Sequence, residues 1–240
     1  MSQFDDLASL YEDFSATPFR QHLEFPTVLG LVKEGPHGNV LDLGCGSGAY
    51  SRLLRGSGAD RVTGLDESTG MIDHARRRER AEGLGIRYLT GELPAELHGT
   101  FDLVLAVYVL PYATTYEELL GLCRTAADAL RPGGRFLTLP VHPDFHRDRD
   151  HYAPYGFRVW TDGERHDGAR VRLRFRDRDV DIIARYWSAE ALGRALVEAG
   201  FAAPRYREHR LSDTAAAGPV AFWEPYLTTP HAAVLDTVRV

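Results

Sequence analysis

Short apolar runs alternate with segments of helical period along the first part of the chain. Five runs predict strands buried on both faces of a parallel sheet, at residues 39–43, 61–65, 86–90, 101–109 and 135–139. Between them, apolar residues recur every three to four positions, and Ser68 is a candidate N-cap for one of the intervening helices. This alternation predicts a doubly wound, mostly parallel, Rossmann-like α/β sheet.

The pattern changes after residue 141. Residues 142–152 are polar and loop-like, whereas residues 157–186 alternate between apolar and polar side chains and contain two Asp-Gly turn signals. We expect antiparallel strands here, added to the edge or top of the sheet after the fifth strand. A helix is predicted over 188–199, and a last strand around 205–211.

The segments at both ends are expected to be helices or loops that close over the sheet. The chain of 240 residues is therefore interpreted as one domain over 1–240. Within it, residues 1–37 form an N-terminal lid, 38–141 the cofactor-binding core, and 142–240 the substrate-side additions and final strands.

Composition narrows the class of protein. The net charge of −6 argues against a nucleic-acid partner. Cys45 and Cys123 have no metal-type spacing and cannot form a disulfide framework. The N-terminus lacks a signal-type apolar core, and no apolar run approaches the roughly 18 residues that span a bilayer. We therefore expect a cytoplasmic protein without membrane contact; its oligomeric state stays open.

The strongest chemical signal is the run Val40-Leu41-Asp42-Leu43-Gly44-Cys45-Gly46-Ser47-Gly48. A strand that ends in glycines lets the backbone approach a ligand at the N-terminus of the next helix, and side chains at Gly44 and Gly46 are expected to collide with that ligand. Asp66 ends the second strand, where a carboxylate can accept hydrogen bonds from ribose hydroxyls. The Gly-x-Gly-x-Gly pattern after an acidic residue favours a cationic amino-acid headgroup over a pyrophosphate.

These motifs resemble those of the class I methyltransferases that use S-adenosylmethionine (SAM). The resemblance is carried by residues 40–48, Asp66, 90–94, 101–106 and 130–136, in the family's order. It implies a seven-stranded-type sheet, and SAM as cofactor with S-adenosylhomocysteine as product. Carried over position by position, it implies these cofactor-binding residues: Gly44, Cys45, Gly46, Asp66, Glu67, Met71, Gly91, Glu92, Leu93 and Ala106. Met71 as ordinary core filler remains an equally good interpretation.

A looser resemblance extends to small bacterial methyltransferases of natural-product pathways (secondary metabolism), including the toxoflavin-type N-methyltransferases. It is carried by Tyr11, 18–20, 106–113, 142–145 and 222–227. It implies that Tyr11 and Arg20 approach the methionine end of SAM, with the Arg20 guanidinium on the SAM carboxylate. The alternative is a packing tyrosine and a surface arginine.

The acceptor side is expected at the carboxyl ends of the strands, where open α/β sheets bind ligands. This places Tyr108, Tyr112 and His142 near the acceptor, with Tyr108 and His142 as catalytic candidates. His142 is the candidate base, because its reference pKa is near neutral. A histidine that caps loop backbone, and a Tyr108 that packs in the core, are the alternatives. Trp187 and Trp223 are candidates for a pocket that binds a planar acceptor.

These observations predict an enzyme that methylates nitrogen or oxygen of a small-molecule acceptor. A methyltransferase acting on a macromolecule and a non-catalytic SAM-binding regulator stay open. A nicotinamide oxidoreductase of the Tyr-x-x-x-Lys type is excluded, because Lys33 is the only lysine. The His and Asp cluster at 142–151 lacks zinc-type spacing, so no metal is expected.

Overall fold

The main sheet has seven strands in the order β3-β2-β1-β4-β5-β10-β9. The computed structural model describes residues 14–176, 181–216 and 219–240, so Tyr11 lies outside the described residues. The strands are β1 (Asn39–Leu43), β2 (Arg61–Asp66), β3 (Arg87–Thr90), β4 (Phe101–Val107), β5 (Leu130–Leu139), β9 (Arg205–Arg207) and β10 (Val234–Val238). The first five pair in parallel, and β10 runs antiparallel to both of its neighbours. The predicted α/β fold is confirmed.

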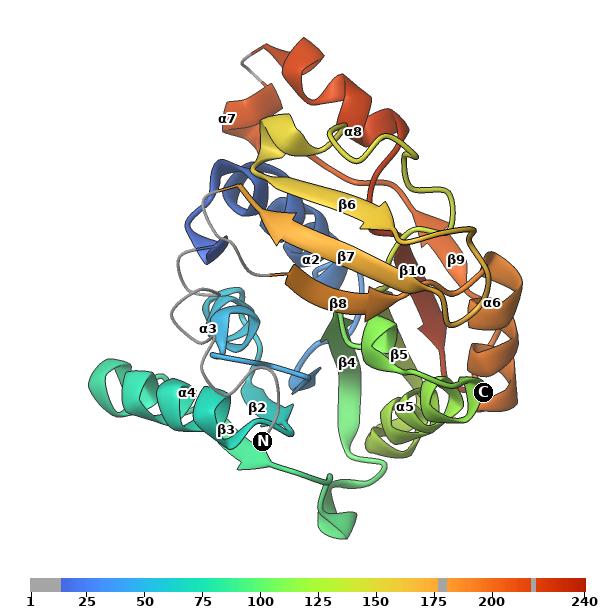
Figure 1. Cartoon of the computed structure of the whole chain (residues 1–240). Coiled ribbons are helices and arrows are strands. Elements are labelled where there is room, and N and C mark those ends of the chain that lie inside the picture. Colours follow the sequence, from blue (N-terminus) through green and yellow to red (C-terminus); the bar gives the residue numbers. More distant parts are fainter. Residues whose placement is uncertain (1–13, 177–180, 217–218) are drawn as a thin grey trace.

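Helices cover both faces of this sheet (Figure 1). They are α2 (Phe25–Val32), α3 (Ala49–Gly56), α4 (Thr69–Glu82), α5 (Tyr116–Ala129) and α6 (Ala189–Glu198). The side chain of Ser68 accepts a hydrogen bond from the Met71 amide, so the predicted N-cap of α4 is confirmed. One apolar core joins α2, α3 and α4 to the sheet, and a second joins α5 and α6.

Strand β10 corrects the expectation for the C-terminal tail. Residues 205–211 do not end the sheet; only Arg205–Arg207 form a strand, at its edge. The strand β10 lies between β5 and β9 and is nearly fully buried. The backbone of β10 pairs with both β5 and β9, whereas a covering loop would leave these buried backbone groups unpaired.

Strand β5 also begins earlier than predicted. The Arg131–Gly134 segment, which precedes the strand predicted at 135–139, lies within β5, and the pairing with β4 shifts register between Phe101 and Leu103. This Pro-Gly-Gly segment therefore forms an irregularity inside a strand, as a bulge does.

The antiparallel segments form a separate three-stranded sheet of β6 (Phe157–Thr161), β7 (Arg170–Phe175) and β8 (Asp181–Arg185). This sheet lies across the end at which β4 finishes (Figure 1), and β8 contacts the turn η3 (Leu110–Tyr112) that follows β4. Its inner face packs on Phe19 and Leu23 from the N-terminal segment and on Tyr226. The sheet therefore closes over the carboxyl edge of the main sheet.

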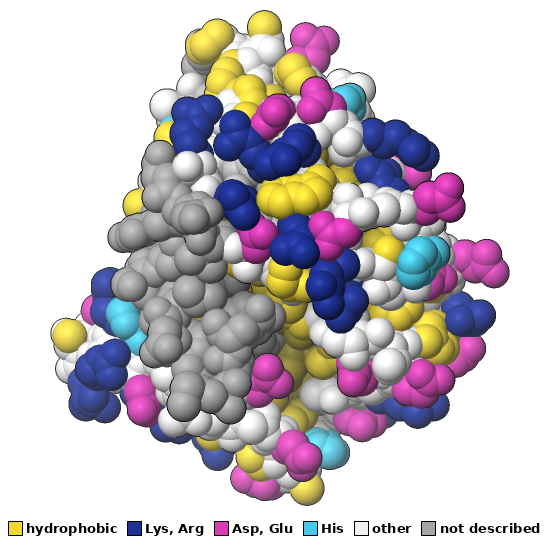
Figure 2. Space-filling view, viewed as in Figure 1, with side chains coloured by type: hydrophobic (Ala, Val, Ile, Leu, Met, Phe, Trp, Pro, Cys, Tyr) yellow, Lys and Arg dark blue, Asp and Glu magenta, His cyan; other side chains and the backbone are white. Residues whose placement is uncertain are grey.

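Arginines and carboxylates interleave on the outer face of the small sheet (Figure 2). Arg172 pairs with Asp162 at 2.7 Å and with Asp181 at 3.1 Å, and Arg174 pairs with Asp181 at 2.6 Å. Arg172 and Arg174 of β7 are thus held in ion pairs on this surface.

Short helices and turns complete the N-terminal segment and the cap, by which we mean the three-stranded sheet and the elements packed on it. They are the π-helix η1 (Arg20–Glu24), the 3-10 turns η2 (Ala95–Leu97), η4 (Ala153–Tyr155) and η5 (Val220–Phe222), and the helices α7 (Asp213–Ala216) and α8 (Glu224–Thr228). Glu34, just beyond α2, pairs with Arg207 at 2.5 Å and Arg210 at 2.7 Å, which fastens the N-terminal helices to the far edge of the sheet. In the three described stretches, each helix is too short or too polar to cross a membrane.

Candidate active site

A cavity of about 730 Å³ opens at the carboxyl ends of β1, β2 and β4. This volume lies within the roughly 300–1,000 Å³ of small-ligand sites. Most predicted cofactor residues line it: Arg20, Gly44, Cys45, Gly46, Asp66, Glu67, Met71, Gly91, Glu92 and Leu93. Tyr108 and Tyr112 line it as well. The sheet topology therefore brings the glycine loop and the tyrosines after β4 to one cavity.

The two glycines of the loop are needed for different reasons. Gly44 has φ +66°, and a Cβ there would lie 2.4 Å from Cγ2 of Val109, so the protein itself excludes a side chain. This reason comes in addition to the predicted collision with a ligand, which stays a prediction. Gly46 has φ +54°, and the nearest atom to a Cβ built there is the Met71 sulfur at 4.0 Å. Because both residues line the cavity, the open space beside Gly46 is available to a ligand.

Asp66 braces the glycine loop against α4. One carboxylate oxygen accepts from the Gly46 amide and the other from the Ser68 amide, each at 2.8 Å. These bonds fix the orientation of the carboxylate at the cavity wall. A carboxylate offers about four acceptor positions, so two backbone bonds are compatible with further bonds to a diol.

Asp42 is a buried carboxyl group in the same wall, with only 2% of its surface exposed. Its Oδ2 accepts a 2.6 Å hydrogen bond from the Ser51 hydroxyl. Burial raises the pKa of Asp42 to about 7; the Ser51 bond opposes this rise and the nearby Asp66 adds to it. The group can therefore ionise near neutrality, and a cation in the cavity would stabilise the ionised form.

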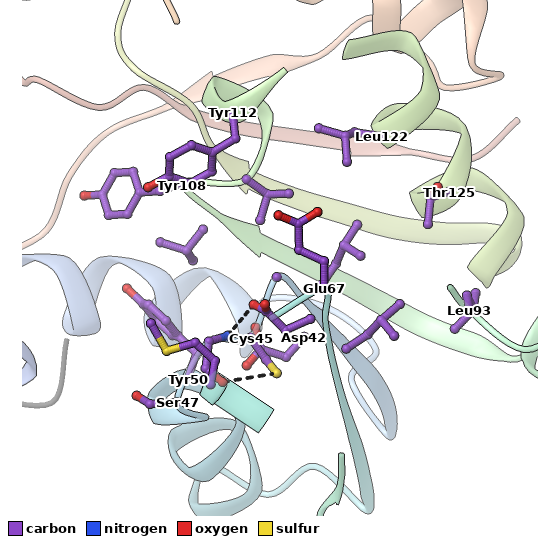
Figure 3. Close-up of a pocket in the computed structure, with 18 of the residues that line it drawn as sticks. Asp42, Cys45, Ser47, Tyr50, Glu67, Leu93, Tyr108, Tyr112, Leu122 and Thr125 are labelled. Atoms are coloured by element: carbon purple, nitrogen blue, oxygen red, sulfur yellow. Dashed lines mark hydrogen bonds between the residues drawn. The ribbon is translucent and has the colours of Figure 1, made fainter. Parts of the chain in front are cut away.

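Six carboxyl groups line the cavity, against the single arginine Arg20 among the described lining residues: Asp42, Asp66, Glu67, Glu92, Glu118 and Asp128. Glu67 points into the space between Tyr112 and Leu122 of α5 (Figure 3). Such a wall favours a ligand with positive charge and disfavours a pyrophosphate.

A buried hydrogen-bond cluster stands behind the Tyr108 end of the cavity. Oε1 of Glu24 accepts from Nε of Arg20 at 2.5 Å and from the Tyr50 hydroxyl at 2.8 Å, and Oε2 accepts from the Tyr108 hydroxyl at 2.5 Å. Tyr108 has φ +58°, a left-handed backbone conformation that residues other than glycine seldom adopt. Burial and the Glu24 carboxylate raise the pKa of Tyr108 well above its usual value, so the phenol stays protonated.

Three predicted site residues, Ala106, Trp187 and Trp223, do not line the cavity. Ala106 is fully buried, and its carbonyl accepts from the Thr138 hydroxyl. Trp187 packs in the core with α6, and Trp223 stacks on Tyr155 in the cap at 5.6 Å. Apolar packing therefore accounts for both tryptophans.

His142 also lies outside the cavity lining. Its Nδ1 accepts a 3.0 Å hydrogen bond from the Asp144 amide, and burial lowers its pKa although Asp144 opposes this. The geometry corresponds to the backbone-capping alternative and does not bring His142 to the cavity lining. Nor do three or more His, Cys, Asp or Glu side chains converge on a possible metal position in the described part of the chain.

Several residues in the cavity lining or directly behind it were not identified from the sequence. Glu24 and Tyr50 meet across the fold, and Leu122 and Thr125 come from the inner face of α5. The only local signal was the i, i+4 spacing of Arg20 and Glu24, which is common on helix surfaces.

Residues 40–134 match the family model described as a methyltransferase domain. The ubiquinone biosynthesis O-methyltransferase of Pectobacterium carotovorum is 29% identical over 141 residues, covering 56% of this chain and 57% of its own. The demethylmenaquinone methyltransferase of Tropheryma whipplei is 35% identical over 117 residues, covering 48% and 45%. The chain thus spans about half the length of these curated relatives.

Solved structures match over nearly the whole chain. A SAM-dependent methyltransferase from Mesorhizobium loti superposes with a TM-score of 0.62 at 23% identity, covering 94% of this chain and all of its own. A SAM-bound aminopentose methyltransferase from Micromonospora echinaspora gives 0.65 at 18%, covering 100% and 99%. The acidic wall, the open space beside Gly46 and the braced Asp66 fit a cationic nucleoside. Residues 40–134 therefore match a methyltransferase domain, and the chain as a whole has the fold of SAM-dependent methyltransferases.

Proposed function

We propose that this protein transfers the methyl group of SAM to a nitrogen or oxygen atom of a small-molecule acceptor. The observation that carries the proposal is one cavity with the glycine loop and Asp66 on one side and Tyr108 and Tyr112 on the other. Its volume of about 730 Å³ and its cover by the three-stranded sheet suit a small acceptor. Relatives named for quinone and aminopentose methylation support this class of acceptor.

For the cofactor, we assign the ribose hydroxyls to Asp66 and the adenine to the loop Gly91–Leu93, with Met71 against its face. The Met71 side chain is 2% exposed and lines the cavity beside Gly46. The amino group is assigned to Asp42 and the carboxylate to Arg20.

When bound, SAM supplies an already activated methyl group on a sulfonium. The chain's own task is then to align the acceptor and to exclude water. Tyr108 and Tyr112, which follow the end of β4, are placed to contact the acceptor, and the small sheet covers them. Because His142 bonds its own loop, the proposal relies on alignment and assigns no base to it.

The test uses SAM with a tritiated methyl group, mixed with the purified protein and a cell extract. Label is then followed in small-molecule, protein and nucleic-acid fractions, with Asp66→Ala, at a SAM concentration too low for that variant to bind it, as the matched control. Label in the small-molecule fraction, absent with the control, supports the proposal. Label confined to macromolecules would assign the alternative acceptor class, and SAM binding without transfer to any fraction would assign a regulator; either overturns the proposal.

A further inference from the structure

Glu24 is a buried acid that touches residues of the cavity wall while lying outside the lining itself. Only 1% of its surface is exposed. It belongs to η1, a π-helix, a rare conformation that is frequent at functional sites. Its carboxylate accepts from side chains of three separate segments: Arg20 in η1, Tyr50 in α3 and Tyr108 after β4.

The bond to Arg20 fixes the plane of a guanidinium that would otherwise be flexible. Glu24 takes the Nε edge at 2.5 Å, and Cζ of Arg20 lies 4.8 Å and 5.1 Å from the ring centres of Phe25 and Tyr50. Burial, the largest single effect, lowers the pKa of Arg20, but Glu24 together with Tyr50 and Tyr108 outweighs it, so the pKa is raised. The result is a charged, preorganised fork of N–H donors in the cavity wall.

The Tyr108 hydroxyl donates to the other oxygen of the same carboxylate. Tyr108 adopts its left-handed backbone only because surrounding contacts hold it there, and the 2.5 Å bond from its hydroxyl to Oε2 is one of them. One carboxylate thus holds a residue assigned to the cofactor and a residue assigned to the acceptor.

We propose that Glu24 is a positioning residue that aligns Arg20 with the carboxylate of SAM and joins that alignment to the placement of Tyr108. The inference rests on the proposed function, because it takes the SAM methionine end to lie at Arg20. Glu24 does not contact the ligand; it acts through the two residues that it binds.

The experiment compares two ligands by calorimetry in the wild type and in Glu24→Gln. S-Adenosylhomocysteine carries the amino-acid carboxylate, whereas 5′-methylthioadenosine is the same kind of nucleoside thioether without the amino-acid end, both its carboxylate and its amino group. The expected result is a roughly 10- to 100-fold weaker affinity for S-adenosylhomocysteine, as for the loss of a charge-assisted hydrogen bond, with 5′-methylthioadenosine unchanged. Unchanged affinity for both ligands, or an equal loss for both, would overturn the proposal.

A matched control removes a comparable buried carboxylate away from the cavity. Asp236 is 5% exposed and accepts from Arg135 at 2.7 Å and Arg207 at 2.6 Å. Asp236→Asn should lower stability without separating the two ligands; if it separates them as Glu24→Gln does, the effect is general and the proposal fails. If Glu24→Gln does not fold, Arg20→Lys tests the same fork and should show the same ligand-specific loss.

Tyr108→Phe tests the second half of the inference. It removes one bond to Glu24 and should weaken S-adenosylhomocysteine binding by part of the same factor. If the affinity of Tyr108→Phe for S-adenosylhomocysteine equals that of the wild type, the proposed coupling of Tyr108 to Arg20 is overturned. A wild-type protein that binds neither ligand would instead refute the proposed function, so the two failures are distinguishable.

Discussion

Replacing Asp42 with asparagine should make the ligand-free protein more stable near neutral pH while weakening its binding of SAM. The carboxyl group is buried, and its pKa is raised from 3.8 to about 7. Between these values the unfolded chain ionises freely and the folded chain does not. The contribution of Asp42 to stability is therefore fully present below about pH 4 and is lost as pH rises through about 7.

The size of this effect follows from the interval between the two pKa values. At about 1.36 kcal/mol for each pH unit, it corresponds to roughly 4 kcal/mol of lost stability above pH 7. The amide of Asp42→Asn can still accept from the Ser51 hydroxyl, but its two donors need partners, at a cost of about 1–3 kcal/mol. A net gain of roughly 1–3 kcal/mol remains.

Urea unfolding, followed by tryptophan fluorescence at about pH 4.5 and about pH 8, measures this difference. The variant should gain on the wild type as pH rises, because only the wild type carries the Asp42 titration. A difference in unfolding free energy that does not change between the two pH values would refute the reasoning.

The Asp42 carboxyl group should also affect the binding of SAM. If the cationic amino group stabilises the ionised form, binding at about pH 6.5 should release a proton from the wild type. Calorimetry in buffers of different ionisation enthalpy detects that proton. Asp42→Asn should release less and bind more weakly, which would make this group a case of stability given up for ligand binding.

Three further predictions concern single residues. Asp66→Ala should weaken SAM binding by roughly 1.5–3 kcal/mol in calorimetry, because charge-assisted bonds are lost together with the brace to Gly46; unchanged affinity would remove Asp66 from the site. Gly46→Ala should lower both SAM affinity and the melting temperature, since a side chain enters the cavity wall at φ +54°; normal binding would contradict the close approach of the ligand. His142→Ala should leave single-turnover methyl transfer within about a factor of ten of the wild type, and a loss of roughly 10²–10⁴-fold would restore it as the base.

The cofactor half of the fold could be predicted because its signals are local. The glycine loop, the acid at the end of β2 and the N-cap Ser68 each lie within a few residues of the structure that they form. Their meeting at one cavity follows from parallel topology, which gathers carboxyl ends at one edge of the sheet.

The site features that the sequence did not predict depend on how the chain packs and turns in three dimensions. Whether Trp187 faces a ligand or a core is decided by the helix α6 that packs on it, and nothing beside Trp187 in the sequence encodes that choice. His142 follows a strand end as an active-site histidine would, yet its loop turns its Nδ1 toward the Asp144 amide. The role of Glu24 depends on Tyr50 and Tyr108, which converge on it from distant parts of the chain.

Strand β10 has a consequence for how the chain folds. It inserts between β5 and β9, so its pairing with β5 must close a loop of residues 140–233, whereas its pairing with β9 spans only residues 208–233. Closing so long a loop adds little free energy, about 0.6 kcal/mol for each doubling of its length, but such distant pairings slow folding. The five parallel strands can assemble first, whereas β9, whose ladder partner in the described sheet is β10, must wait for it. The edge of β5 therefore stays open until late and exposes unpaired backbone groups to other chains during that interval.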